Sequence, residues 1–389
     1  MWGFIFGGML VLAILGVIYL WTRFKKFGIV KKLAGEKKWL LNVLAMIPLL
    51  IFGICFALDY VNTGIVLVHM SVYWALAELI AALIRKLRGK KEAAETDQTE
   101  ETKKAAGKDE AAGKKGFQPY IVGILVLCFE LSYFSVGWVL DHHVWKKEYQ
   151  LTTEKNLGME KLRIALIADS HVGTTFDGEG FARHLKTIEA ENPDVLVISG
   201  DFVDDDTSKE DMYRCCLALA GFQCKYGVYF VYGNHDKGYF NYRNFTAEEL
   251  KNALDAAGVQ VMQDEVQLVD GKFYIVGRQD KSVRDRISID KIMPLLDPSK
   301  YAIVLDHQPA DYDAEAAAGA DLVLSGHTHG GQMLEINMVG ALMGANDRTY
   351  GLETRDKTDF IVTSGISDWR IKFKTGTSSE YCIIEVVQK

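Results

Sequence analysis

The sequence predicts an α/β protein in which two packed mixed β-sheets are flanked by helices (an α-β-β-α sandwich), preceded by a four-helix transmembrane region. Long uncharged apolar runs fill the first 145 of the 389 residues and are scarce afterwards. In the remainder, short apolar segments alternate with amphipathic ones and then give way to a strand-rich second half, which is typical of two sheets with outer helices. We expect a membrane region over 1–145 and a soluble domain over 146–389.

Composition and charge limit the class of function. The formal net charge of −7 argues against nucleic-acid binding, because a nucleic-acid-binding domain presents a basic face. An anionic substrate would then need local positive charge, which bound metal ions can supply. The six cysteines lack the Cys-x-x-Cys spacing of a zinc site, and the sequence leaves open whether they are buried thiols or disulfide partners.

Four apolar runs are long enough to cross a bilayer, which takes about 20 residues. They cover about residues 3–21, 39–58, 64–84 and 119–140. The first run is followed rather than preceded by positive charge, and no small-residue cleavage site comes after it, so we expect a retained helix and not a signal peptide. The sequence therefore predicts a multi-pass protein of the cell membrane.

Lysine and arginine in the loops predict the orientation. The loops 22–38 and 85–91 are strongly basic, whereas the connection 59–63 carries no positive charge. Both basic loops should be cytoplasmic, which places the soluble domain on the extracytoplasmic side; Lys146 and Lys147 oppose this orientation weakly.

The segment 89–116 is rich in lysine, glutamate and alanine and has almost no large apolar residue. Such a segment cannot bury enough surface to offset the entropy of ordering. We expect a disordered cytoplasmic loop, with transient helix at most, that serves as a spacer; a partner-binding tail is the alternative.

Three ionisable residues lie within the apolar runs, His69 and Glu78 in the third and Glu130 in the fourth. Charged groups there are costly and often functional. We expect Glu130 to pair with His69 and so to stabilise the helix bundle. The alternative is that Glu130 lines a binding cavity.

The soluble part begins with a strand and alternates with helices as far as residue 257. A helix over 246–257 carries the clearest start signal, because Thr246 and Glu249 form a capping box. The other predicted helices begin near 179 and cover 209–220. Strands are predicted over 162–168, 195–199, 228–232, 259–262, 273–276, 302–305, 322–324, 360–363 and 381–386.

Polar stretches follow five of these strands. In open α/β sheets, functional groups gather at the carboxyl ends of the strands. The five stretches are Asp169-Ser170-His171, Gly200-Asp201, Gly233-Asn234-His235-Asp236, Asp306-His307 and Gly326-His327-Thr328-His329-Gly330-Gly331. Each stretch alone has an ordinary interpretation as a turn or loop; their joint occurrence at strand ends indicates a shared site.

The distribution of histidine indicates that this site binds metal. Of the six histidines after residue 146, only His184 lies outside the five stretches. Imidazole and carboxylate together suit zinc, manganese or iron. Because so many ligands exceed the needs of one tetrahedral zinc, we expect two ions, about 3.5–4 Å apart, that share a carboxylate. Asp201 is the natural bridge.

The series Asp-x-His, Gly-Asp-x-x-Asp, Gly-Asn-His-Asp, His and Gly-His-Thr-His resembles the calcineurin-like metallophosphoesterase superfamily, over roughly 161–387. Its extension as far as Gln332 resembles the membrane-associated bacterial phosphodiesterase branch. The resemblance implies a metal-dependent hydrolase of phosphoric esters with two divalent or trivalent ions. The motifs are specific for the superfamily and poorly specific for the substrate.

The resemblance also implies roles for individual residues. One ion would be held by Asp169, His171, Asp201 and His329. The other would be held by Asp201, Asn234, His307 and His327. A hydroxide bridging the ions would attack phosphorus in line. His235 would stabilise the transition state or protonate the leaving oxygen, Asp236 would orient His235, and Asp204 or Asp205 would orient metal ligands.

One segment departs from the family pattern: residues 368–373 stand where relatives often have a proline-containing stretch. Five arginines are candidate phosphate contacts, namely Arg278, Arg284, Arg286, Arg348 and Arg370. Arg278 is the preferred one, together with Asp280, because both follow a strand.

Taken together, the sequence predicts a membrane-anchored phosphoesterase that hydrolyses phosphodiester or diphosphate bonds. A lipid-linked phosphate ester or an envelope precursor would fit a domain tethered close to the bilayer. The alternatives are a receptor or sensor whose soluble domain binds metal without catalysis, and a structural membrane-assembly protein.

Overall fold

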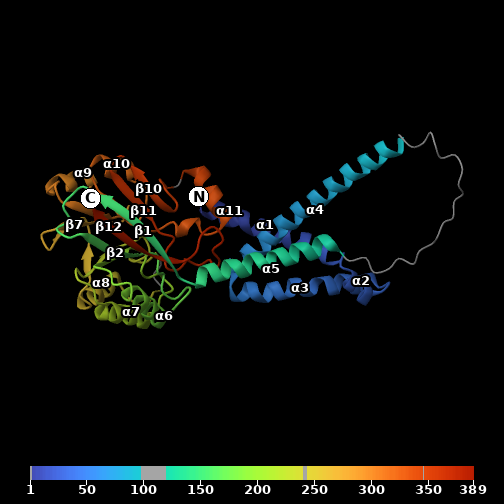
Figure 1. Cartoon of the computed structure of the whole chain (residues 1–389). Coiled ribbons are helices and arrows are strands. Elements are labelled where there is room, and N and C mark those ends of the chain that lie inside the picture. The colour runs from blue at the N-terminus through green and yellow to red at the C-terminus, as the bar shows by residue number, and fades with distance from the viewer. Residues whose placement is uncertain (1, 98–119, 240–242, 345) are drawn as a thin grey trace, which may run out of the picture. The chain divides into compact units, whose positions relative to one another are not determined.

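The computed structural model describes residues 2–97, 120–239, 243–344 and 346–389, with the backbone alone for 2–10, 89–97, 339 and 341–343. The chain divides into two compact units, Met1–Phe134 and Ser135–Lys389 (Figure 1). Helix α5 (Ile121–His142) contributes to both units, since its last two turns belong to the second. The domain boundary predicted after residue 145 stays a prediction.

Unit 1 is helical. Its helices are α1 (Trp2–Phe24), α2 (Gly28–Ala34), α3 (Lys38–Leu58), α4 (Tyr60–Asp97) and the first part of α5. Within the described residues, three helices are long and apolar enough to cross a membrane: Lys38–Leu58, Tyr60–Arg88 and Ile121–His142. The span predicted over 3–21 lies in α1, of which the described apolar part, Val11–Phe24, is shorter. Three of the four predicted spans are thus helices long and apolar enough to cross a membrane, and the crossing itself and the first span stay predictions.

Helix α4 is longer than the sequence indicated. It continues to Asp97, so residues 89–97 are helical where we expected a disordered loop. The physical reason is that lysine, glutamate and alanine, which dominate this stretch, are strong helix formers. The rest of the predicted loop, 98–116, lies outside the described residues.

Two sets of paired polar side chains connect the helices of unit 1. His69 Nδ1 lies 2.9 Å from Glu130 Oε2, and both side chains are buried, which confirms the predicted pair. Glu78 forms ion pairs with Arg23 at 2.8 Å and Lys26 at 2.7 Å. Because these pairs join α4 to α5 and to the end of α1, each contributes an interhelical contact to the bundle.

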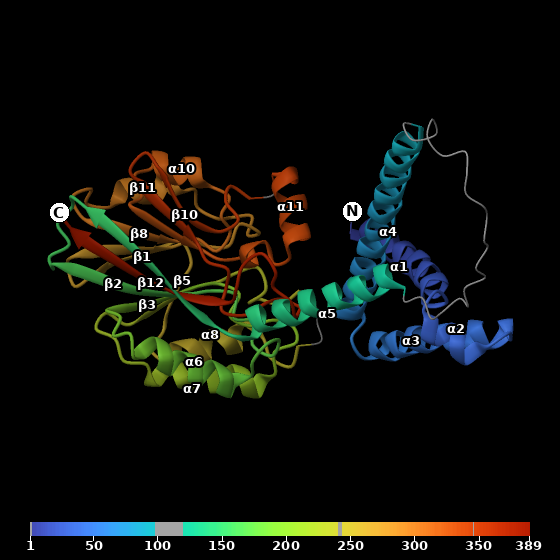
Figure 2. The ribbon, with the colours of Figure 1, turned by 45° about the vertical axis from the view of Figure 1, so that its right-hand side comes forward.

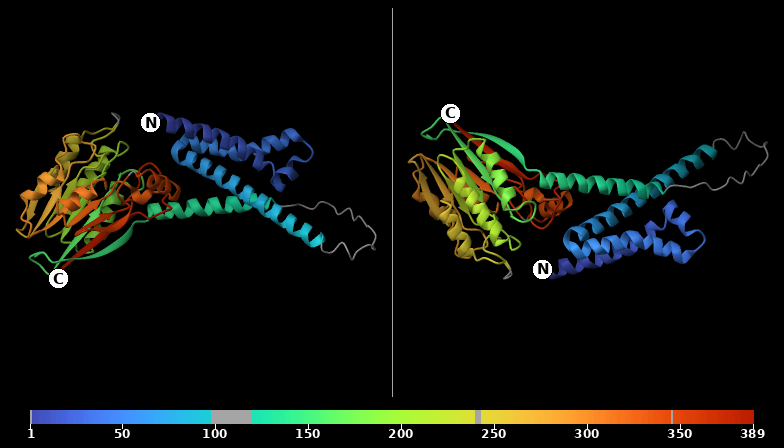
Figure 3. Two further views of the ribbon diagram at one scale, coloured as in Figure 1. Left: turned by 90° about the horizontal axis from the view of Figure 1, so that it is seen from above. Right: turned by 90° about the horizontal axis from the view of Figure 1, so that it is seen from below.

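Unit 2 contains two six-stranded mixed sheets, which Figure 3 shows as separate layers. The first sheet has the order β1 (Trp145–Thr153), β12 (Glu380–Gln388), β2 (Lys161–Ile167), β3 (Val195–Ser199), β4 (Val228–Val231) and β5 (Gln260–Met262). The second has the order β10 (Gly351–Arg355), β11 (Thr358–Val362), β9 (Leu322–Ser325), β8 (Tyr301–Leu305), β7 (Phe273–Gly277) and β6 (Glu265–Val269). Strands β2 to β5 run parallel, as do β7, β8, β9 and β11.

Helices cover the outer face of each sheet (Figure 2). Alternate residues of β2 show this layering, because Ile164 and Leu166 pack between the sheets while Ala165 and Ile167 pack under helices. The helices on the first sheet are α6 (Gly178–Glu189), α7 (Lys209–Gly221) and α8 (Ala247–Ala256). Those on the second are α9 (Ile289–Ile292), followed by the 3₁₀ turn η1 (Met293–Leu295), and α10 (Tyr312–Ala317). The predicted α-β-β-α sandwich is confirmed.

Local predictions were most accurate where the sequence carries a strong signal. The capping box of Thr246 and Glu249 is present at the start of α8. Strands β1, β6 and β10 were missed, because most of their side chains are polar or exposed. Strand β1 lies at a sheet edge and pairs in parallel with β12. Helix α11 (Leu334–Met343), which follows the last histidine motif, was also missed.

Candidate metal centre

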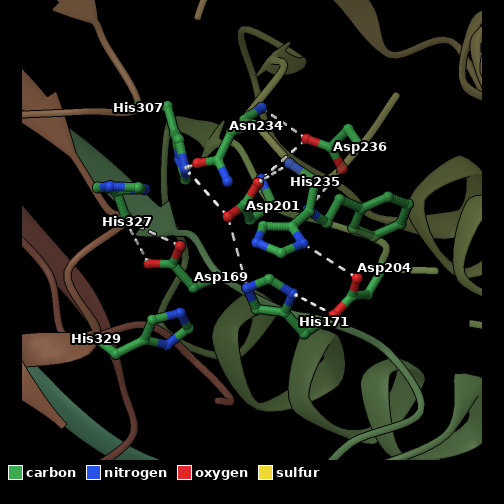
Figure 4. Close-up of polar contacts among 12 residues, drawn as sticks. Asp169, His171, Asp201, Asp204, Asn234, His235, Asp236, His307, His327 and His329 are labelled. Atoms are coloured by element: carbon green, nitrogen blue, oxygen red, sulfur yellow. Dashed lines mark hydrogen bonds and ion pairs between the residues drawn. The ribbon is translucent and has the colours of Figure 1, made fainter. Parts of the chain in front are cut away.

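The five polar stretches converge at the carboxyl ends of the parallel strands (Figure 4). Neighbouring strands β2, β3 and β4 place one group of side chains there, and β8 and β9 of the other sheet place a second group opposite. The first group comprises Asp169, His171, Asp201, Asn234 and His235. The second comprises His307, His327 and His329. The site is therefore formed by both sheets together.

The backbone at the site adopts a conformation that ordinary side chains avoid. Asp169, Asp201 and His327 have φ values of 52°, 51° and 70°. Such left-handed residues cost about 1–3 kcal/mol each and occur mainly at functional sites. A Cβ on Gly233 would lie 2.2 Å from Asp201 Oδ1, so only glycine permits the close approach of these two loops.

Asp201 lies at the centre of the group and is buried. Its Oδ2 atom is 3.2 Å from His307 Nε2 and 3.6 Å from His171 Nε2. Its Oδ1 atom accepts the backbone N–H of His235 at 2.8 Å. The carboxylate therefore faces ligands from both sheets, which is the position that a bridging ligand requires.

The atoms around His307 show that this half of the site fits a cation. Its Nδ1 atom lies 2.8 Å from the carbonyl oxygen of Ser199, so Nδ1 carries the hydrogen of the neutral ring. The lone pair of Nε2 then faces Asp201 Oδ2 and Asn234 Oδ1, each 3.2 Å away. In the neutral ring, three electron-pair donors thus converge with no hydrogen between them. A positive charge is favoured there, either a metal ion or a proton on His307, whose pKa Asp201 raises well above its usual value despite burial.

The other half repeats this arrangement. Ligand atoms of Asp169, His171 and His329 lie within 4.8 Å of one another, as do those of Asp201, His307 and His327. His329 Nδ1 lies 2.8 Å from Asp368 Oδ1, and His171 Nδ1 lies 3.3 Å from Asp204 Oδ2. A carboxylate on Nδ1 leaves Nε2 free to bind metal and fixes the orientation of the ring.

Burial and neighbouring charges shift the pKa values of the candidate ligands. Burial first, and then the charge of His307, lowers the pKa of His327 to about 3. Burial likewise lowers the pKa of His329 to about 3. Burial alone would raise the pKa of Asp201, but the charge and hydrogen bonding of His307 and the charge of His171 hold it well below its usual value. At neutral pH His327 and His329 are thus neutral imidazoles, the form that metals bind. Burial would also lower the pKa of His171 and His307, but hydrogen bonding to neighbouring carboxylates and the charge of these groups raise it.

The acid that orients His235 differs from the one we predicted. Asp204 Oδ1 lies 3.1 Å from His235 Nδ1. Asp236 instead accepts backbone N–H groups of Asp201 at 2.9 Å and Gly233 at 2.7 Å. It holds two ligand loops together, a function that its position next to His235 in the sequence could not reveal.

The arginine predictions were wrong for Arg278 and Arg286. Arg278 is 2% exposed and pairs with Asp306 at 3.2 Å, Asp311 at 3.3 Å and Glu315 at 3.4 Å. Arg286 also pairs with Asp306, so both guanidinium groups are held by carboxylates rather than available to phosphate. Of the other candidates, Arg348 pairs with Glu353 and Arg370 with Asp206. Arg284 is exposed, and the side chains of Arg348 and Arg370 are 39% and 38% exposed, so these three stay predictions.

Two residues near the site were not identified from the sequence. Asp368 contacts His329 across 39 residues of sequence, and no spacing pattern connects them. The ring of Trp369 lies 5.1 Å from that of His235, between centroids, and 41% of Trp369 is exposed. Both belong to the segment that departs from the family pattern, which was the only signal available.

Comparison with known proteins identifies the domain. A family model described as calcineurin-like phosphoesterase matches residues 162–331. An uncharacterized metallophosphoesterase of Aquifex aeolicus is 32% identical over 190 residues, 48% of this chain and 69% of the relative. One of Campylobacter jejuni is 27% identical over 277 residues, 68% of this chain and 71% of the relative.

Two further relatives add a membrane protein and a solved structure. A transmembrane protein with metallophosphoesterase domain of Bos taurus is 28% identical, over 57% of this chain and 52% of the relative. A dimetal phosphatase structure from Danio rerio matches with a TM-score of 0.35 at 13% identity, over 52% of this chain and 87% of that one, a likeness too low to support an inference. On the match to its relatives and to the family model, the chain belongs to the calcineurin-like metallophosphoesterase family.

Proposed function

We propose that the protein is a membrane-anchored phosphoesterase with a dinuclear metal centre, acting on phosphodiester or diphosphate bonds. The observation that carries the proposal is the convergence of buried ligand atoms from both sheets on Asp201, with electron pairs facing one another at His307. Family membership supports the same chemistry, because the matching model is described as a phosphoesterase.

The ligands divide into two sets that share Asp201. One set is Asp169, His171, Asp201 and His329, and the other is Asp201, Asn234, His307 and His327. Manganese, zinc or iron suits these nitrogen and oxygen donors. When bound, the ions would activate water as a nucleophile and offset the negative charge of the phosphoryl group.

The protein itself supplies the proton for the leaving group. His235 points toward the ligand cluster in Figure 4, and Asp204 holds its Nδ1 atom. This leaves Nε2–H of the imidazolium free to protonate the leaving oxygen, after which the neutral ring retains its orientation. The same carboxylate contacts His171, so one residue positions both a ligand and the proton donor.

Membrane anchoring rests on the three candidate spans, and a span over 3–21 would make four. The basic loops favour an extracytoplasmic catalytic domain, and a domain tethered in this way suits lipid-linked phosphates or envelope precursors. Labelling of single cysteines introduced at 89–116 tests the orientation in intact cells. Protection from impermeant reagents supports it, and labelling from outside overturns it.

The experiment that tests the activity starts from purified full-length protein stripped of metal. It is then supplied with manganese, zinc or iron and assayed on an aryl phosphodiester and the matching monoester, with bound metal measured in parallel. Turnover that requires about two ions per chain supports the proposal. Two bound ions without turnover on soluble or lipid-linked phosphates would favour a metal-binding sensor, and folded protein that binds no metal would overturn the metal centre itself.

A further inference from the structure

Unit 2 carries a group of exposed apolar side chains that its fold does not explain. Helix α11 contributes Leu334, Ile336 and Met338, which are 50%, 46% and 61% exposed. The last turns of α5 contribute Val136 and Val139, which are 56% and 50% exposed. With Trp369, we call these six residues the apolar rim. Figure 2 shows α11 and the end of α5 on the same side of the sheets of unit 2.

A short segment joins the two helices that form the rim. The backbone N–H of Lys374 donates to the carbonyl oxygen of Gly137 in α5 at 3.0 Å. The N–H of Leu334, the first residue of α11, donates to Thr375 Oγ1 at 3.1 Å. A Cβ on Gly137 would lie 2.9 Å from Thr375 Cγ2, so α5 and this segment pack in direct contact. Residues 374–375 therefore fix the start of α11 relative to the end of α5.

The length of α5 sets the depth at which this contact lies. Its 22 residues are all part of a candidate span. At about 1.5 Å per residue they extend roughly 33 Å, close to the thickness of the hydrocarbon core. Gly137 is five residues from the end and thus lies within about 8 Å of it. In a bilayer that α5 spans from end to end, whatever packs on Gly137 lies at the boundary between the hydrocarbon and the head groups.

We propose that α11 and Trp369 form a membrane-contact element, whose partner is the lipid bilayer itself. The apolar side chains of α11 would enter the head-group boundary as those of an interfacial helix do. Continuity with α5 argues for lipid over a second protein, because any protein covering the rim would have to share this depth with the lipid around α5.

The position of the element has a consequence for the metal centre. Helix α11 begins five residues after the ligand His329, and Trp369 lies beside His235. The metal centre would therefore open next to the lipid surface, and a phosphate carried on a lipid could reach it without leaving the bilayer. This consequence rests on the proposed function, whereas the membrane contact does not.

The test measures lipid contact directly, in full-length protein in phosphatidylcholine nanodiscs. The exposed cysteines Cys55 and Cys128 and the half-buried Cys224 are first replaced by alanine. An environment-sensitive fluorophore is then attached at Met338→Cys or, as a second variant, at Ile336→Cys. The matched control is Leu295→Cys, which is 81% exposed on η1 after α9, at the opposite end of unit 2 from α11 (Figure 1).

We expect blue-shifted emission and quenching by acyl-chain-brominated lipid at both α11 positions, and neither effect at Leu295→Cys. If the α11 probes respond as the control does, the proposal is wrong. If they are shielded from iodide in water yet not quenched by brominated lipid, a protein covers α11, which also overturns it. No turnover is measured, so failure here is distinct from failure of the proposed activity.

Discussion

Two buried polar clusters lie side by side at the end of β8, and they solve the problem of buried charge differently. Asp306 belongs to an arginine cluster, where it pairs with Arg278 and Arg286. The next residue, His307, belongs to the metal centre, where it faces Asp201. Within the described part of the chain, no lysine or arginine lies within ion-pair distance of Asp201, whose partners are histidines.

The difference distinguishes a cluster with permanent cations from one that suits a bound metal ion. A buried charge is costly unless an opposite charge accompanies it. The arginine cluster contains cations that are always charged, whereas Asp201 in the metal centre has only histidines as partners, which can give up a proton to a metal ion. Both clusters lie at strand ends, so this position in the sequence could not distinguish one from the other. Arg278 was therefore mistaken for a phosphate contact.

The largest expected effect comes from removing the shared carboxylate. Asp201→Asn should lose both ions and lower turnover of an aryl phosphodiester by about a thousand-fold, since metal ions supply several kcal/mol of transition-state stabilisation. Metal analysis and steady-state kinetics measure both. The exposed neighbour variant Asp206→Asn should retain both properties. Two ions and near-normal turnover in Asp201→Asn would show that the two halves of the centre are independent.

Removing the proposed proton donor, His235, should lower turnover without loss of metal, unlike removal of a metal ligand. His235→Asn should keep both ions while turnover falls about 10²–10⁴-fold on a substrate with a poor leaving group. The loss should be smaller with nitrophenolate, which leaves without a proton. His184→Asn, on α6, is the control. Equal losses for both leaving groups would contradict a role in protonation.

A smaller effect on metal binding is expected from Asp368, which contacts the ligand His329 and not the metal itself. Asp368→Asn should weaken metal binding about 10–100-fold, because it loosens the orientation of His329. Titration of metal-free protein gives the affinity, and excess metal should restore turnover. Unchanged affinity, or a defect that excess metal does not repair, would remove Asp368 from this role.

The arginine cluster should affect stability and leave the metal centre intact. Arg278→Met leaves buried carboxylates without their partner and should lower the free energy of unfolding by about 3–5 kcal/mol. Burial first, and then repulsion by Asp306, raises the pKa of Glu315. A carboxyl whose pKa is raised in the folded state lowers the stability of the protein as pH rises through that pKa. Because Arg278 opposes the rise in the pKa of Glu315, the stability deficit of Arg278→Met should be larger at mildly alkaline than at mildly acidic pH.

Denaturant unfolding of the variant and the parent protein at both pH values measures this deficit. The folded variant should bind metal as the parent protein does. Loss of metal from folded Arg278→Met would show that the two clusters are coupled through β8.

The sequence predicted elements and ligands better than it predicted partners. Strand ends followed by histidine and aspartate identified the site because parallel strands bring their carboxyl ends together. The partner of His235 could not be read in this way, since Asp204 and Asp236 both lie in the motifs and only their orientation separates them. Asp368 reaches His329 through the fold alone. Strand β1 was missed because it is a half-buried edge strand whose charged residues interrupt the apolar pattern that predicts a strand.

The contact between α5 and residues 374–379 has a consequence for how the protein can vary. The carbonyl oxygens of Gly137 and Leu140 accept the N–H groups of Lys374 and Ser379. The same segment bonds to Gln332, next to the last histidine motif. A chain that starts at Trp145 would leave two donors without these partners. A helix with a larger residue in place of Gly137 would displace Thr375, next to the segment that bonds to Gln332. The end of α5 is therefore part of the fold of unit 2, and a larger residue at Gly137 should require a compensating substitution at Thr375.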